Sequence, residues 1–338
     1  MKLLHAEWKR FFARRFVRIM LGVIVVLLAL VAIGTGHNDH KLTPAVRAHA
    51  QVFADQQIQQ AKQQLTACQA AQTPSGGSTD PQYQLPSGVT CDQAFGEFTP
   101  TASDFLPSTF VFATDGTSQL VIFGVLLALF GFAVGASYVG AEWSSGGMAN
   151  LLLWRPRRLS VLGGKLGALL VSVFVSGLAF LVIWLLMLST LAIFRGSFGD
   201  VTSGVIQSMA LSTARAFALA LATAAIGFAV ASIGRNTASA LGIAVGYIVV
   251  FEAGGLVVAR LANIARPERF LLSRYVAAWL EKNQSFATNP VCTQNGFSSQ
   301  CSSSEWFMRM GSAAEVLGIV TAALLAWAFI AMRRRDVT

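Results

Sequence analysis

Few residues of this chain have the types and spacing that catalysis needs. The four histidines all precede the second long apolar segment, at His5, His37, His40 and His49. Imidazole is the commonest general base and a frequent metal ligand, so the later segments lack the usual group for either role. Gly163, Gly164 and Lys165 are followed by Leu166, without the glycine spacing or the Ser or Thr of a nucleotide-binding loop. We therefore predict that the chain is not an enzyme, has no metal site and binds no cofactor or ATP itself.

Two ionisable residues, Arg215 and Glu252, lie inside long apolar runs. A charge within a bilayer is costly and by default suggests function. At about 1.5 Å of rise per residue, both fall in the outer half of their helices, where they are candidates for an intramembrane charge pair. Bridging two helices or reaching the membrane interface is the simpler interpretation, and contact with a substrate is the alternative.

The composition is that of a membrane protein. Hydrophobic residues make up 54% of the chain, charged residues only 12%, and the mean hydropathy is +0.58, whereas soluble domains carry about 25% charged residues. A spanning helix needs roughly 20 apolar residues, and six stretches approach that length. We predict an all-α membrane protein with six transmembrane helices, at residues 19–35, 117–140, 161–194, 204–233, 238–258 and 312–332.

The distribution of Lys and Arg predicts the orientation, because positive residues are retained on the cytoplasmic side. They cluster at the N-terminus, between the second and third spans, at Arg235, and in the tail at 333–338. With six spans these regions share one side, so both termini are expected in the cytoplasm of a bacterial cell. The net charge of +9 then reflects this topology and contact with anionic lipids rather than with nucleic acid.

Residues 1–18 repeat apolar side chains at helical spacing, with Lys and Arg on other faces. This pattern predicts an amphipathic helix in the membrane interface. A signal peptide is the alternative, since a positive segment precedes an apolar one. We expect an uncleaved anchor.

The two long loops, 36–116 and 259–311, fall on the predicted outside and carry all four cysteines. An oxidising exterior permits two local disulfides, Cys68–Cys91 and Cys292–Cys301. The first loop is expected to contain a helix at about 43–72 and the second an amphipathic piece at about 267–281, followed by a polar turn. Together the loops would form a small external cap.

Small residues recur every three or four positions along the fourth span, and Gly131 and Gly135 form one GxxxG in the second. Such surfaces let helices approach closely. Packing within the chain and contact with another subunit both fit this pattern.

A short basic insert at 141–160 separates the second and third spans. Glu142, Ser144 and Ser145 interrupt the apolar run, Gly146 and Gly147 permit a turn, and the residues up to Trp154 can form a helix that Pro156 ends. A short helix lying along the membrane can pass a partner's movement to the spans attached to it. The alternative interpretation is a connecting loop whose basic residues serve only to keep it on the cytoplasmic side.

This arrangement resembles the permease subunits of type-2 ABC exporters over the whole chain. The resemblance rests on the N-terminal helix with Glu7, Trp8 and Lys9, the six spans, the external insert, and the Glu142, Gly146–Gly147, LLLWRPRR and Lys165 pattern. Gly147 is followed by Met148 where Thr is more usual, and the external loops are longer and carry cysteines. These departures concern the class of substrate that is carried and not the architecture.

In that family the cytoplasmic element is a coupling helix seated in a separate ATP-binding subunit. The resemblance therefore assigns a set of residues to coupling: Glu142, Gly146, Gly147, Leu151, Leu152, Leu153, Trp154, Arg155, Pro156, Arg157 and Arg158. It implies two ATP-binding subunits, which hold the ATP and magnesium, and a second permease copy. The implied function is export of a hydrophobic or amphipathic compound by alternating access across the plasma membrane. A membrane sensor or envelope-assembly scaffold that signals through an ATPase is the alternative.

Overall fold

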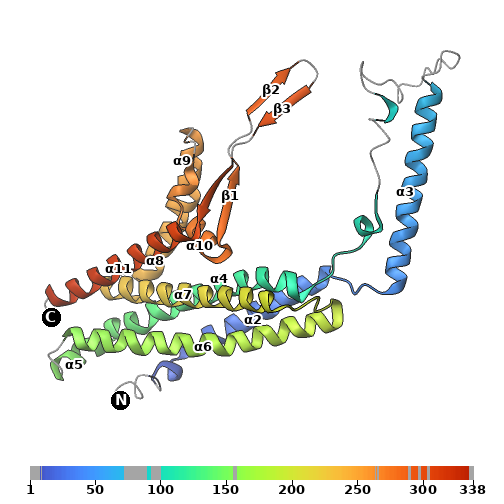
Figure 1. The fold of residues 1–338 in the computed structure, drawn as a ribbon. Coiled ribbons are helices and arrows are strands. Elements are labelled where there is room, and N and C mark those ends of the chain that lie inside the picture. The colour runs from blue at the N-terminus through green and yellow to red at the C-terminus, as the bar shows by residue number, and fades with distance from the viewer. Residues whose placement is uncertain are drawn as a thin grey trace. The chain divides into compact units, whose positions relative to one another are not determined.

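The structure is a computed structural model that describes residues 8, 10–71, 90–92, 100–154, 158–262, 264, 266–287, 291–295, 298–302 and 305–334. The described part is mostly helical (Figure 1). Six of its helices are long and apolar enough to cross a membrane: Arg15–His37, Phe112–Ser144, Arg158–Arg195, Ser203–Gly234, Thr237–Ala259 and Met310–Arg334. Each contains one of the predicted spans, so the six predicted apolar helices are confirmed as helices.

Five of these helices are continuous. They are α2 (Arg15–Asn38), α4 (Phe112–Ser144), α6 (Arg158–Arg195), α7 (Ser203–Gly234) and α11 (Met310–Arg334). The fifth candidate span is composite. It comprises α8 (Thr237–Tyr247), a π-helical segment η4 (Ile248–Gly254) and α9 (Gly255–Leu261). A π-helix inside an α-helix is rare and is often found at a functional site.

The chain divides into two compact units. The first comprises residues 1–32, 112–189 and 199–338, and its core is the pair of helices α4 and α7. Gly131 faces the backbone oxygen of Ala220, and a Cβ on Gly135 would overlap Ala224. The Thr223 hydroxyl donates to the Ala128 carbonyl across the same interface, at 2.8 Å. The small-residue surfaces thus serve packing within the chain.

Phe11 lies in the N-terminal segment of this unit. The described part of that segment is helical at Arg10–Ala13, and α2 begins at Arg15. Phe11 is fully buried and its ring centroid lies 5.9 Å from that of Tyr138 in α4. Residues 1–7 and 9 of the interfacial helix predicted at 1–18, among them Glu7 and Lys9, lie outside the described residues.

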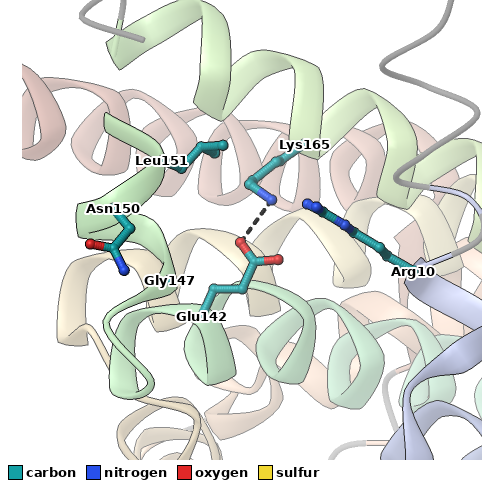
Figure 2. A pocket seen from close by; sticks show the side chains of 6 residues that line it. All are labelled: Arg10, Glu142, Gly147, Asn150, Leu151 and Lys165. Atoms are coloured by element: carbon teal, nitrogen blue, oxygen red, sulfur yellow. Dashed lines mark ion pairs between the residues drawn. The ribbon is translucent and has the colours of Figure 1, made fainter. Parts of the chain in front are cut away.

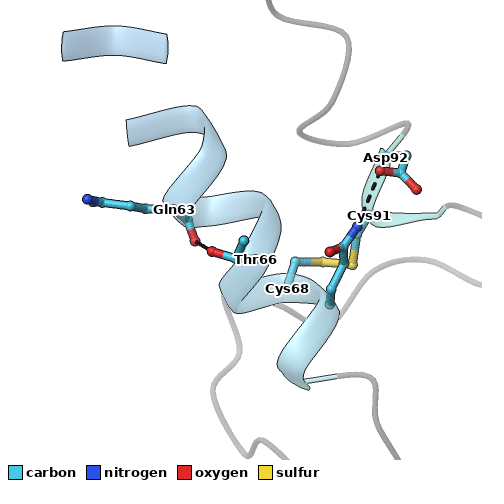
Figure 3. Close-up of a disulfide and its surroundings, with 6 residues drawn as sticks. Gln63, Thr66, Cys68, Cys91 and Asp92 are labelled. Carbon is cyan, nitrogen blue, oxygen red and sulfur yellow. Dashed lines mark hydrogen bonds between the residues drawn. A yellow bond between two sulfur atoms is a disulfide. The ribbon is translucent and has the colours of Figure 1, made fainter. Parts of the chain in front are cut away.

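The second unit comprises residues 33–111 and 190–198. Its main element is α3 (Pro44–Ala71), which confirms the helix predicted in this loop. The disulfide Cys68–Cys91 joins the end of α3 to a later segment, with the two Cα atoms 5.9 Å apart (Figure 3). In the short 3-10 helix η3 (Ala102–Phe105), hydrogen bonds from the backbone and hydroxyl of Thr101 hold the pKa of Asp104 below its ordinary value.

The loop after α9 differs from the prediction. The helix expected at 267–281 is divided into η5 (Pro267–Phe270) and α10 (Leu272–Glu281). The polar turn expected after it contains two antiparallel pairs of strands, β1 (Asn283–Ala287) with β4 (Glu305–Arg309) and β2 (Val291–Asn295) with β3 (Ser298–Ser302). The all-α expectation is therefore corrected for this loop.

These strands lack the β-branched alternation that identifies strands in a sequence. Contacts between distant residues support them instead. In the β1–β4 pair, Phe286 lies opposite Trp306 and their rings stack with centroids 4.9 Å apart. In the β2–β3 pair, the register sets Cys292 opposite Cys301. The side chains of that hairpin lie outside the described part, so the second disulfide stays a prediction.

Candidate functional site

The connection between α4 and α6 contains the short helix α5 (Gly147–Trp154). Gly146 has φ of 71°, in the left-handed region that favours glycine, and this residue ends α4 and redirects the chain into α5. Met148 is fully buried, which fixes one side of α5 against the first unit. A short helix therefore lies where the sequence predicts one.

Some of the residues assigned to coupling are described by the structure, and others lie outside its described part. Glu142 lies on the last turn of α4 and is half-buried. In α5, Gly147 is exposed and Leu151 is half-buried. Arg158 is half-buried and begins α6. The remaining assigned positions include the side chains of Leu152, Leu153 and Trp154 and the whole of Arg155, Pro156 and Arg157, which lie outside the described residues.

Glu142 forms two ion pairs with cations from different parts of the chain. Its Oε2 lies 2.7 Å from the Lys165 ammonium of α6, and its Oε1 accepts from the Arg14 guanidinium, which lies just before α2. The Lys165 side chain is only 3% exposed and that of Glu142 17%. A buried charge is costly unless it is paired, so the ion pair with Glu142 lowers the cost of placing Lys165 in the interior.

Tyr138 lies one turn before Glu142 on α4 and forms the base of this cluster. Its side chain is fully buried. The Arg14 guanidinium carbon lies 4.7 Å from the ring centroid and the Lys165 ammonium 5.6 Å, both within cation–π range. Arg14 also donates to the Tyr138 carbonyl at 2.6 Å. The position of each cation is therefore set by a carboxylate and by an aromatic face.

A pocket of about 450 Å³ opens beside the cluster. It is lined by Arg10, Glu142, Gly147, Asn150, Leu151 and Lys165, so the N-terminal segment, α4, α5 and α6 all contribute to it. Figure 2 shows Arg10 and Lys165 directing their cationic ends into the same space near Glu142. Through this pocket α5 is adjacent to the ion pairs that join three other segments.

Arg235 makes a further contact at this end of the first unit. It follows α7, has a positive φ of 54°, and places its guanidinium 5.1 Å from the ring centroid of Trp143. Gly140 packs directly on Thr237 at the start of α8. The end of α4 near α5 is therefore in contact with the α7–α8 turn as well.

The contacts around Glu142 join several segments of the chain. Among the described residues, no group of three or more His, Cys, Asp or Glu side chains could hold a metal ion. One carboxylate, Glu142, joins the end of α4 to the N-terminal segment and to α6.

The structure does not bring Arg215 and Glu252 together. Arg215 donates to the carbonyls of Leu211 and Leu280 and to the Ser212 hydroxyl. Glu252 accepts from the Tyr247 hydroxyl and from the backbone and hydroxyl of Ser273. Both residues thus contact α10, at opposite ends, and in the described part of the chain no ion pair joins the two.

Sequence reasoning did not assign Arg14, Tyr138 or a pairing role for Lys165. Two signals were present in the sequence. Tyr138 and Glu142 are four residues apart and so share one face of a helix. Lys165 is a charge one or two turns inside an apolar run, a position where a partner is required. Arg14 could not be distinguished from the other basic residues near it.

Comparisons with known proteins agree with this description. The protein-family model described as "ABC-2 family transporter protein" matches residues 1–337. No curated protein and no solved structure gives a significant match. Because the match covers almost the whole chain, and because the described part holds six candidate spans, this chain belongs to the ABC-2 family of transporter proteins as a membrane-spanning permease component.

Proposed function

We propose that this chain is the permease subunit of an ATP-driven exporter and that α5 is its coupling helix. The observation that carries the proposal is the position of Glu142. This carboxylate ion-pairs with Arg14 and Lys165 and lines the same pocket as Gly147, Asn150 and Leu151 of α5. A force applied to α5 therefore reaches the N-terminal segment, α4 and α6 within one cluster.

In this proposal two ATP-binding subunits hold the ATP and magnesium. Their closure on ATP binding pushes α5, and the ion pairs of Glu142 carry the movement into the spans. Two permease copies, identical or different, enclose the path and alternate between inward and outward access. The distribution of Lys and Arg supports placing α5 and both termini in the cytoplasm.

The spans favour a hydrophobic or amphipathic substrate. The described residues of the fifth span are largely apolar and exposed in the single chain, including Val249, Val250 and Phe251, each 60% exposed. The two charges within the apolar spans, Arg215 and Glu252, make hydrogen bonds within the chain. The surfaces left for a substrate or a second permease copy are therefore apolar, and a strongly charged cargo would find little to replace its hydration.

The proposal can be tested by reconstituting the chain with its ATP-binding partner in proteoliposomes. Rhodamine 6G and a lipid labelled with a fluorescent headgroup are suitable amphipathic probes. We expect ATP-dependent movement of at least one probe across the bilayer, and none when the partner carries an inactivated ATP site. Hydrolysis without movement of any probe, together with binding of an envelope protein to the loops, would favour the sensor or scaffold function instead.

A further inference from the structure

The helix α10 lacks a cap of its own at its amino-terminal end. Leu271 occupies the N-cap position and makes no side-chain cap hydrogen bond. The fifth span supplies the missing acceptors. The Tyr247 hydroxyl accepts from the Leu272 amide at 3.0 Å, and Glu252 accepts from the Ser273 amide at 2.9 Å and from its hydroxyl at 2.5 Å. A carboxylate from the π-helical segment therefore caps α10.

The carboxyl-terminal end of α10 is capped by the fourth span. Arg215 of α7 donates to the Leu280 carbonyl at 2.9 Å, and the Trp279 indole donates back to the Arg215 carbonyl at 2.9 Å. The Leu280 carbonyl is one of the last four of the helix, which have no partner within it. Arg215 is only 8% exposed, so this contact is almost fully enclosed.

The signs of the two charges match the helix dipole. An α-helix carries a partial positive charge at its amino end and a partial negative charge at its carboxyl end. Glu252 lies at the positive end of α10 and Arg215 at the negative end. Each of the two charges is therefore stabilised by the end of α10 that it contacts, without a direct ion pair between them.

The two ends of α10 are held unequally. At the carboxyl end, Ala278 is buried in a cluster with Met308 and Ala313, which is flanked by Tyr275, Trp279, Phe286 and Trp306. At the amino end, Ser273 is exposed and its bonds to Glu252 are on the surface. The carboxyl end is thus fixed to α7, α11 and β4. At the amino end Leu271 is 3% exposed, but the polar contacts to Glu252 and Tyr247 that cap the helix are at least partly open to solvent.

We propose that α10 is a latch between the fourth and fifth spans. It pivots at Arg215 and Trp279 and closes at Glu252, so the two spans separate at this end only when the Ser273 end of α10 is released. The transport role of the latch rests on the proposed function, because it makes this release a step in opening the permease. The contacts themselves are independent of that function.

Amide hydrogen exchange on the full chain in detergent tests the closing contact. We expect Glu252→Gln to speed exchange about tenfold at the amino end of α10, because a charged acceptor is lost, and to leave the peptide that contains Trp279 and Leu280 unchanged. Glu315→Gln, an exposed substitution in α11, is the matched control and should change neither peptide. Equal acceleration at both ends of α10, or none at the amino end, would overturn the latch.

A reducible cross-link tests whether release matters for transport. The double variant Glu252→Cys/Ser273→Cys, joined by a short bis-methanethiosulfonate linker, is reconstituted with the ATP-binding partner and assayed with rhodamine 6G. We expect transport to fall at least tenfold when linked and to return on reduction. The wild-type chain passes through the same treatment, since reduction also reaches the native disulfide Cys68–Cys91.

The outcomes separate the two proposals. Undiminished transport by the linked variant, or failure of the two positions to link at all, would overturn the latch. Absence of ATP-driven movement of the probe in the wild-type chain would overturn the proposed function, and the exchange experiment would still decide whether α10 is held as described.

Discussion

The first unit holds two charged clusters that differ in what balances each charge. Around Glu142, a carboxylate contacts two cations, Arg14 and Lys165. Around α10, Arg215 and Glu252 bond to backbone and hydroxyl groups. Gly124 of α4 packs on Ala216, the neighbour of Arg215 in α7. From Gly124 to Glu142, at about 1.5 Å of rise per residue, the two clusters lie roughly 27 Å apart along α4.

This difference bears on which cluster is suited to movement. A carboxylate with two cationic partners can weaken one ion pair while the other keeps it neutralised. Arg215 is 8% exposed and bonds to a carbonyl that the end of α10 fixes in place, so this buried contact has one geometry, whereas the contact of Glu252 with Ser273 is exposed. We therefore infer that the Glu142 cluster transmits displacement, and that the Arg215 end of α10 acts as a fixed point.

The largest expected effect comes from removing the shared carboxylate. Glu142→Gln leaves the buried Lys165 and the half-buried Arg14 facing each other, and removing one partner of a buried pair costs about 3–5 kcal/mol. The double variant Glu142→Gln/Lys165→Met removes the buried cation as well and should recover most of that loss. Unfolding in detergent followed by tryptophan fluorescence measures both. Equal stability of the single and double variants would show that the two charges are not coupled.

A smaller effect is expected at Arg215. Arg215→Met leaves the Leu280 carbonyl without its partner and the end of α10 without its cation, a loss of about 2 kcal/mol. Arg215→Lys should lose less, because the charge remains. The exposed Arg195→Met is the matched control and should lie within about 0.5 kcal/mol of wild type. If Lys and Met are equally destabilising, the charge at the end of the helix is not what matters.

Ser273→Ala tests the opposite end of the same helix. It removes only the exposed hydroxyl contact and keeps the backbone bond to Glu252, so we expect about 0.5–1 kcal/mol in the same unfolding assay. A loss as large as that of Arg215→Met would contradict the unequal holding of α10.

The smallest change in stability is expected for Arg157→Gln/Arg158→Gln, because glutamine keeps a long, polar, hydrogen-bonding side chain at both positions. Transport driven by the ATP-binding partner should nevertheless fall severalfold if this segment contacts the partner. Comparing thermal unfolding with transport in the same preparation separates the two effects. Undiminished coupling would remove these arginines from the coupling segment.

Much of the helical architecture follows from the sequence, because a span needs a long apolar run and little else. The predicted spans and the helix at α3 lie within the observed helices, and α5 lies between Gly146 and the proline that follows it in the sequence. Glycine spacing predicted close helix packing, but only the structure shows that Gly131 and Gly135 meet α7 of the same chain. Periodicity on one helix does not identify its partner.

The remaining features depend on contacts between residues far apart in the sequence. Arg215 and Leu280 are separated by 65 positions, and Arg14 and Glu142 by 128. The strands β1 and β4 pair across an intervening hairpin, and their sequences, NQSFA and EWFMR, do not alternate strictly between polar and apolar residues. In each case the local sequence offers a charge or a polar stretch, and only the fold determines what balances or pairs with it.

The central claim is that Glu142 carries the movement of α5 into the spans, and transport per ATP hydrolysed tests it most directly. The double variant Glu142→Gln/Lys165→Met is reconstituted with the ATP-binding partner, and hydrolysis and rhodamine 6G movement are measured in the same vesicles. We expect hydrolysis to continue while the amount of probe moved per ATP falls at least tenfold. An unchanged ratio in a folded, assembled complex would contradict it.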